Sequence, residues 1–134
     1  MKIRITITSF GHLHGPRPAD AHITLDLREH FRDPHWDTTL RELTAHDHQV
    51  IRAVLRTPGI RPMIAATVAQ AQAYASGPSA AEHPLHIAVG CAGGRHRAGV
   101  TARLLAHRLR RRGHHVTLHH RDLHRPVVHR PRST

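Results

Sequence analysis

The feature that most constrains the fold is an apolar strand followed by a glycine-rich turn and a helix. Residues 85–89 are largely apolar, and residues 90–97 continue as Gly-Cys-Ala-Gly-Gly-Arg-His-Arg. An amphipathic pattern then predicts a helix over 96–112. This order of elements is a common way to build an anion site, because glycines let the backbone approach a phosphate and the helix dipole favours negative charge.

The rest of the chain predicts further strands and helices of the same kind of fold. Apolar periodicity places strands over 2–9, 22–28 and 115–119, and helices from 44–47 to 57 and from 61–62 to 75. Residues 29–45 have no clear period and predict a long ordered loop. The strand, helix and strand between 85 and 120 predict a right-handed, parallel βαβ unit.

We therefore expect one α/β domain with a small mixed or parallel sheet over residues 1–124, followed by a basic, loosely ordered tail over 125–134. At 134 residues the chain can bury a core without disulfides or metals. The single cysteine, Cys91, excludes an internal disulfide and is typical of a reducing compartment. No apolar run has membrane-spanning length and the N-terminus has no signal-peptide pattern, so we predict a cytoplasmic protein with no membrane partner.

Charge is the second constraint on function. The chain carries 20 Lys and Arg against 9 Asp and Glu, a formal net charge of +11. Arginines concentrate between residues 95 and 132, where Asp122 is the only acidic residue. Such clustering favours an anionic partner, which could be a nucleic acid, an acidic protein or a phosphorylated metabolite, over the alternative that arginine is abundant through coding bias.

The glycine-rich turn carries a possible nucleophile. Cys91, Gly94 and Arg97 have the spacing Cys-x-x-Gly-x-x-Arg, which is similar to the phosphate loop of cysteine-dependent phosphatases. In that chemistry a thiolate attacks phosphorus while loop amides and the arginine hold the oxygens. Gly90 and Ala98 depart from the usual histidine and hydroxyl residue of that pattern. A phosphatase using Cys91 and Arg97 stays an alternative, and the favoured interpretation of Cys91 is a small buried residue that lets the loop close.

A resemblance covers nearly the whole chain. The sequence is similar to the C-terminal domain of the RapZ family in a series of separated motifs that occur in the same order: Ser9-Phe10-Gly11, His14-Gly15, Ala19-Asp20, Asp26-Leu27-Arg28, Asp33-Pro34-His35-Trp36, Leu40-Arg41, Thr44, Asp47, the glycine-rich run 90–97 and His120-Arg121-Asp122-Leu123. The run 90–97 resembles the family signature Gly-Cys-Thr-Gly-Gly-Lys-His-Arg-Ser. It departs from that signature at Ala92, Arg95 and Ala98.

The resemblance implies a binding module rather than a catalyst. RapZ proteins are RNase adapters whose C-terminal domain binds small RNAs and senses glucosamine-6-phosphate, and whose full-length form is a tetramer. By this likeness we expect no cofactor, a phosphorylated small-molecule ligand, RNA, a ribonuclease or regulatory protein partner, and a homo-oligomer. The family's N-terminal P-loop kinase-like half is not carried over, since no Gly-x-x-x-x-Gly-Lys-Ser/Thr sequence occurs. A nucleotide-binding or protein-scaffolding domain is a further alternative.

Candidate ligand contacts follow from the loop and from the resemblance. We expect the phosphate to be cradled by the loop amides and by three consecutive cations, the full set being Cys91, Ala92, Gly93, Gly94, Arg95, His96 and Arg97. His35 matches a family position near the pocket and could bond a sugar hydroxyl, with stacking on Trp36 as the alternative. Asp20 and Arg28 complete the predicted set. For Arg28 a structural ion pair with Asp26 is the favoured interpretation.

The remaining basic residues form the predicted RNA surface. They occupy the polar side of the helix over 96–112 and the segment that follows it: Arg103, His107, Arg110, Arg111, Arg121, Arg125 and Arg130. Several histidines occur in close pairs, but no zinc-binding motif is present and the pairs lack nearby carboxylates, so we predict no metal site. Protonation of these histidines below about pH 6.5 should tighten polyanion binding.

Overall fold

The computed structural model describes residues 2–31 and 40–126. Every predicted strand and helix is present, with ends that differ by a few residues from the predicted ones, and two single turns of 3-10 helix, η1 and η3, were not predicted. The elements are β1 (Arg4–Gly11), η1 (His12–His14), β2 (Ile23–Asp26), α1 (His48–Arg56), α2 (Ile60–Ala75), η3 (Ala80–Glu82), β3 (Leu85–Cys91), α3 (Arg97–Arg111) and β4 (His115–His120).

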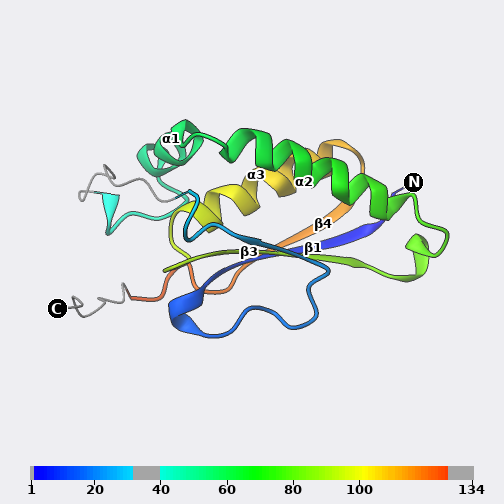
Figure 1. Cartoon of the computed structure of the whole chain (residues 1–134), viewed down its shortest axis with the longest axis horizontal. Coiled ribbons are helices and arrows are strands. Elements are labelled where there is room, and N and C mark those ends of the chain that lie inside the picture. The colour runs from blue at the N-terminus through cyan, green and yellow to red at the C-terminus, as the bar shows by residue number, and fades with distance from the viewer. Residues whose placement is uncertain (1, 32–39, 127–134) are drawn as a thin grey trace.

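The four strands form one sheet in the order β2-β3-β1-β4. All three neighbouring pairs are parallel, which resolves the mixed-or-parallel prediction in favour of a parallel sheet. The predicted βαβ unit of β3, α3 and β4 is parallel, but β1 lies between its two strands. The helices cover one face of the sheet, and the connection from β1 to β2 runs beneath the other (Figure 1).

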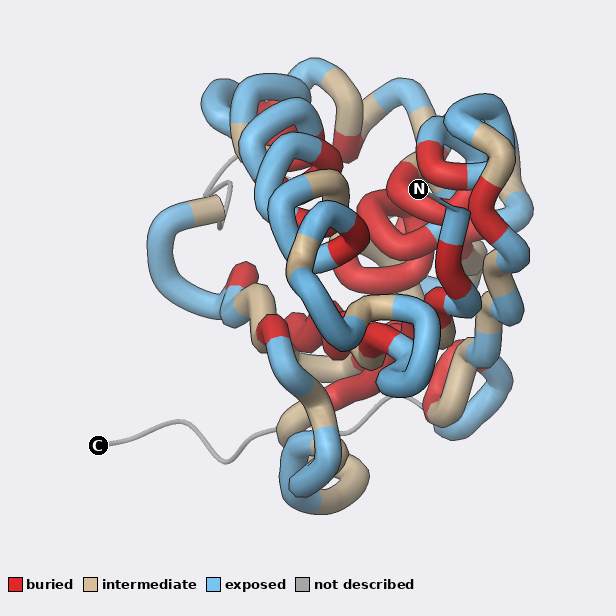
Figure 2. The backbone as a smooth tube through the Cα atoms, turned by 90° about the vertical axis from the view of Figure 1, so that its right-hand side faces the viewer, coloured by how far each residue is buried: buried red, intermediate tan, exposed pale blue. Residues whose placement is uncertain are grey.

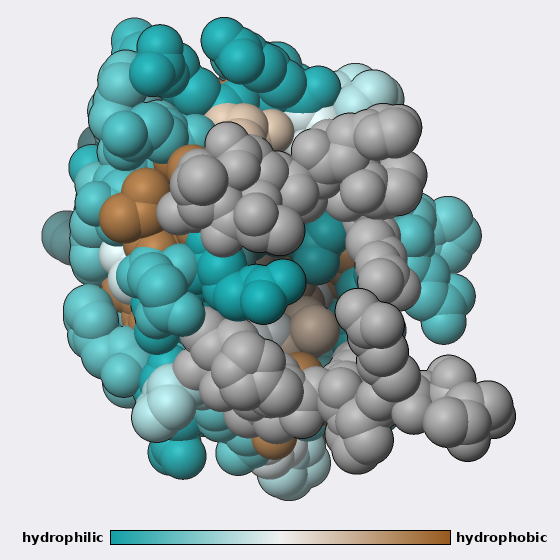
Figure 3. Space-filling model, turned by 90° about the vertical axis from the view of Figure 1, so that its left-hand side faces the viewer, coloured by the Kyte–Doolittle hydropathy of each residue, from teal (hydrophilic) through white to brown (hydrophobic). Residues whose placement is uncertain are grey.

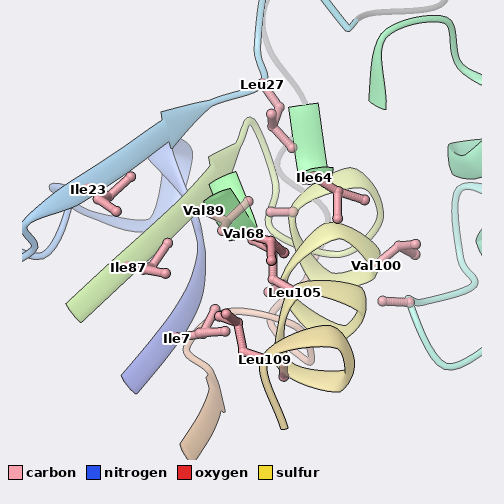
Figure 4. Close-up of a cluster of buried hydrophobic side chains, with 14 of the residues drawn as sticks. Ile7, Ile23, Leu27, Ile64, Val68, Ile87, Val89, Val100, Leu105 and Leu109 are labelled. Carbon is pink, nitrogen blue, oxygen red and sulfur yellow. The ribbon is translucent and has the colours of Figure 1, made fainter. Parts of the chain in front are cut away.

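The core lies between the sheet and the helices. Ile7 and Ile87 project from the sheet toward Leu105 and Leu109 of α3, and Val68 of α2 joins them (Figure 4). All five side chains are buried, and each such burial contributes roughly 1.5–3 kcal/mol of hydrophobic stabilisation. Buried segments gather in the middle of the molecule and exposed ones form its periphery (Figure 2). None of the described helices is both long enough and apolar enough to cross a lipid bilayer.

Parallel pairing brings the carboxyl ends of the strands to one edge of the sheet. The register sets Gly11, the last residue of β1, beside Cys91, the last residue of β3. This edge is at the left of Figure 1. The glycine-rich loop between β3 and α3 therefore starts where two strands end together.

Candidate functional site

The glycine-rich loop is packed directly on the end of β1. A Cβ atom built on Gly11 would lie 2.4 Å from the carbonyl carbon of Gly93 and 2.5 Å from its oxygen. A Cβ atom built on Gly94 would lie 2.7 Å from the Gly11 nitrogen, and Gly94 has a left-handed φ of 76°. Both positions therefore require glycine, because any side chain would collide with backbone.

Inside the loop, the cysteine thiol has a structural partner. The Gly94 amide donates a hydrogen bond to Cys91 Sγ over 3.2 Å. Cys91 is buried, with only 3% of its surface exposed. The thiol thus closes the loop, which is the role that the sequence favoured for it, and the Gly94 amide is engaged within the loop.

Gly93 is the open position of the loop. A Cβ atom built on it would meet no atom of the described residues within 4 Å. The loop therefore has one side sealed against β1, and on its other side, at the carboxyl edge of the sheet, the described residues leave space around Gly93. Figure 3 looks onto this end of the molecule, where much of the described surface is hydrophilic.

The three cations that follow the glycines hold backbone carbonyls of distant segments. Arg95 donates to the carbonyls of Glu42 and Arg125 (2.8 and 2.9 Å), and Arg97 donates to that of Phe31 (3.0 Å). The ring of His96 hydrogen-bonds the Leu43 carbonyl over 2.7 Å. The sequence predicted that these cations would avoid mutual repulsion by binding a phosphate, and the structure shows carbonyl oxygens as partners that the sequence could not reveal.

Burial sets the protonation of the middle cation. The pKa of His96 is lowered, first by burial, and the neighbouring positive charges of Arg95 and Arg97 lower it further. Arg95 Nε is buried and has no hydrogen-bond partner among the described residues. The loop therefore combines an imidazole whose pKa is lowered with two guanidinium groups.

A buried carboxylate ties this loop to the end of the chain. Asp122 is fully buried, and its Oδ2 accepts hydrogen bonds from the Gly11 amide (2.8 Å) and from Arg121 Nε (3.0 Å). Its other oxygen, Oδ1, forms an ion pair with Arg125 Nε at 3.0 Å. Asp122 and Gly11 both lie in motifs that carried the family resemblance, but no local pattern indicates their contact, which spans 111 positions.

A second polar group lies at the end of β2. Arg28 and Asp26 form an ion pair at 2.7 Å, as the structural interpretation of Arg28 predicted, and this hydrogen-bonded guanidinium lowers the pKa of Asp26 to about 2. His12 Nε2 lies 3.8 Å from the same carboxylate. The η1 turn that carries His12 is joined to the loop, because the Leu13 amide donates to the Ala92 carbonyl over 3.0 Å. Arg28 is therefore near the loop but already paired.

Two other predicted ligand contacts are not part of this group. The Asp20 carboxylate pairs with His86 at 3.2 Å, near the amino end of β3, whereas the loop follows the carboxyl end of that strand. His35 lies outside the described residues. The structure thus places Arg28 near the start of the loop, since the amide of its neighbour Leu27 donates to the Gly90 carbonyl over 2.8 Å, and it separates Asp20 from the loop.

The predicted RNA-contacting residues divide into two groups. Four of them are exposed on α3: Arg103, His107, Arg110 and Arg111. Arg121 instead faces inward, because it pairs with Asp122 and lies over the Phe10 ring, 5.1 Å from its centre. Arg125 is half exposed but pairs with Asp122, and Arg130 lies outside the described residues. The α3 group therefore is the freely presented basic surface.

Comparison with known proteins decides the family. The family model described as the RapZ C-terminal domain matches residues 3–124. The chain belongs to the RapZ C-terminal domain family. The motifs that carried the resemblance lie within the matched range, and they include both partners of the contact between Gly11 and Asp122.

Longer relatives share this domain. The chain is 38% identical over 118 residues to a protein of Thermobifida fusca, an alignment that covers 87% of this chain. It is 39% identical over 110 residues to a protein of Acidothermus cellulolyticus, an alignment that covers 81% of this chain. A protein of Streptomyces coelicolor is 34% identical over 113 residues, 84% of this chain. Each bears the name nucleotide-binding protein. The chain spans only 40%, 35% and 37% of their respective lengths, so their names describe proteins more than twice as long.

Proposed function

We propose that this domain is a non-catalytic binding module that holds a phosphorylated small molecule at residues 90–97, with an amino-sugar phosphate such as glucosamine-6-phosphate as its ligand. The observation that carries the proposal is the open space beside Gly93, at the carboxyl edge of a parallel sheet and next to Arg95 and Arg97. Ligands of open α/β sheets bind outside the carboxyl ends of the strands. Membership of a family of binding domains supports the same assignment.

The structural contacts of the loop do not use all of its hydrogen-bond donors, so some remain for a ligand. A guanidinium group has five N–H donors, and the bond to the Phe31 carbonyl uses one donor of Arg97. The positive end of the α3 dipole faces the same region, because α3 begins at Arg97. In this proposal the phosphate lies beside Gly93. His35 and the Asp26–Arg28 pair are proposed to bind the sugar hydroxyls.

The first prediction concerns ligand-induced stabilisation. A thermal-shift panel of hexosamine phosphates, other sugar phosphates, nucleotides and inorganic phosphate should show the largest increase in melting temperature with a hexosamine phosphate, since binding to the folded state alone stabilises it. Arg97→Ala should abolish the increase. Gly93→Ala should reduce it, because the added methyl group would occupy the open space where the phosphate lies.

The matched control for this panel is Arg111→Ala, which removes an exposed arginine of the same helix far along its length. It should keep the full ligand-induced increase. Equal increases in all four proteins would contradict the proposed site. A larger increase with a nucleotide than with any sugar phosphate would favour the second candidate, a nucleotide-binding domain, which the names of the longer relatives suggest.

RNA binding is the second part of the proposal, and it rests on the exposed basic face of α3. We expect the logarithm of the RNA association constant to fall linearly with the logarithm of salt concentration, because phosphate contacts release counterions. Arg103→Ala and Arg111→Ala should each reduce that slope by about one. Arg52→Ala, an exposed arginine of α1, should leave it unchanged. A salt-insensitive or absent gel shift would contradict RNA binding and favour a protein-scaffolding role.

The proposed assembly follows the same family likeness. We propose that the domain works in a homo-oligomer in the cytoplasm, with a ribonuclease or regulatory protein as macromolecular partner.

The phosphatase alternative makes a separate prediction at the same loop. It requires turnover of an aryl phosphate that Cys91→Ser abolishes, whereas a binding module is inert in both forms.

A further inference from the structure

Three histidine rings from three segments pack together beside the start of α3. The ring centres of His46 and His120 are 5.7 Å apart in an edge arrangement, and those of His46 and His124 are 6.1 Å apart in a stacked one. His46 comes from the segment before α1, His120 ends β4, and His124 follows it. We call these three residues the histidine cluster. No group of three His, Cys, Asp or Glu residues within 2–31 and 40–126 is arranged to hold a metal ion.

The ring of His120 in the histidine cluster is held by a hydrogen bond to the sheet. His120 Nδ1 lies 2.6 Å from the hydroxyl of Ser9, a fully buried residue of β1. This bond sets the ring orientation and leaves Nε2 as the nitrogen for any other ligand. His46 and His124 are both exposed, so an ion in solution can reach the cluster.

The surroundings of the histidine cluster are positively charged. The pKa of His120 is lowered, first by burial and then by the charges of His46, His119, His124 and Arg103. Arg103 comes from α3 and His119 from β4, whereas β1 contributes the neutral hydroxyl of Ser9.

The neighbouring carboxylates are already engaged. Asp47, next to His46 in the chain, accepts the Thr44 amide over 2.7 Å. Asp122, next to the other end of the cluster, is held by Gly11, Arg121 and Arg125. Among residues 2–31 and 40–126 these neighbouring carboxylates are therefore already hydrogen-bonded, so protonation of the cluster places positive charges close together that an external anion can balance.

We propose that the histidine cluster, together with Arg103, is a second anion site that takes up protons and a phosphate group together. It shares no residue with the loop at 90–97, where two arginines are permanently charged. Because a bound anion favours the charged form of each ring, anion affinity must rise as the pH falls through the range in which the cluster titrates, by up to about tenfold per pH unit for each proton taken up.

The test measures affinity and protonation separately. Tripolyphosphate is titrated into the full chain by calorimetry at pH 8 and pH 6, and the histidine pKa values are measured by NMR with and without it. We expect affinity at least tenfold higher at pH 6 and a His120 pKa raised by tripolyphosphate. A parallel arm uses single-stranded RNA, whose phosphodiesters do not titrate in this range. A pH-dependent gain with RNA as well assigns the site to a nucleic acid backbone, and a gain with tripolyphosphate alone assigns it to a free phosphate.

Two double variants make the test specific. His46→Asn with His124→Asn should lose the pH-dependent gain, while the Arg97-dependent ligand shift stays. His83→Asn with His115→Asn removes two exposed histidines outside the cluster and should keep the gain. The proposal is overturned by equal gains in both double variants, or by a His120 pKa that tripolyphosphate does not change. Failure of the site at 90–97 would appear instead as a missing Arg97-dependent shift, so the two proposals fail independently.

Discussion

Gly11→Ala should destabilise the domain by about 3 kcal/mol, a cost typical of overpacking a closed interior. The added methyl group would lie 2.4–2.5 Å from the Gly93 carbonyl, and neither backbone segment can move without disturbing the sheet edge or the loop. Chemical denaturation monitored by circular dichroism measures the loss, which corresponds to a melting temperature lower by roughly 10 °C for a domain of this size. Gly11→Ala should also abolish ligand binding at 90–97, because the loop must shift to make room for the methyl group.

The control for this substitution is Gly93→Ala, on the other side of the same contact. Its φ is not in the left-handed region and its Cβ would enter open space, so its free energy of unfolding should stay within about 0.5 kcal/mol of the wild-type value. Equal stability of the two variants would show that the loop does not pack on β1 in this way.

Asp122→Ala should have the second large effect, a loss of about 3–5 kcal/mol in the free energy of unfolding. The substitution leaves the Gly11 amide without its acceptor and removes the counter-charge of Arg121 and Arg125 from a fully buried position. Urea denaturation measures the change. The conservative variant Asp122→Asn keeps the volume and one oxygen acceptor, so it should lose less.

The outcome that would contradict the role of Asp122 is a free energy of unfolding for Asp122→Ala within about 0.5 kcal/mol of the wild-type value, as for an ordinary surface substitution. Binding provides an independent check. Because Asp122 holds Gly11, and Gly11 holds the loop, Asp122→Asn should weaken the ligand-induced shift even where it leaves the fold intact.

Local patterns in the sequence were sufficient to predict the strands and α-helices of the described residues, although not the 3-10 turns η1 and η3. The apolar run at 85–89, the glycines after it and the amphipathic pattern over 96–112 each depend on neighbouring residues, and the structure has β3, the loop and α3 in those places. The order of strands depends on pairing between distant segments. The position of β1 between β3 and β4 therefore had no signature that periodicity could reveal.

The candidate site shows the same division. The loop and the Asp26–Arg28 pair were predicted, since the residues of each are neighbours in sequence. The partners of Arg95, His96 and Arg97 were not, because backbone carbonyls are available at every position and carry no sequence signal. The inward orientation of Arg121 was missed for a related reason: its partners at Gly11, Gly15 and Pro16 lie more than a hundred positions away.

The pairing of β1 with β4 also determines how late in translation the site can form. β1 is synthesised before β3 and β4, yet its end is held by a side chain 111 positions later. During translation, β1 can pair with β3 before β4 and Asp122 have left the ribosome, but the edge that supports the glycine-rich loop is incomplete until then. A nascent chain that stops before residue 115 can therefore hold most of the core and still lack a finished binding loop.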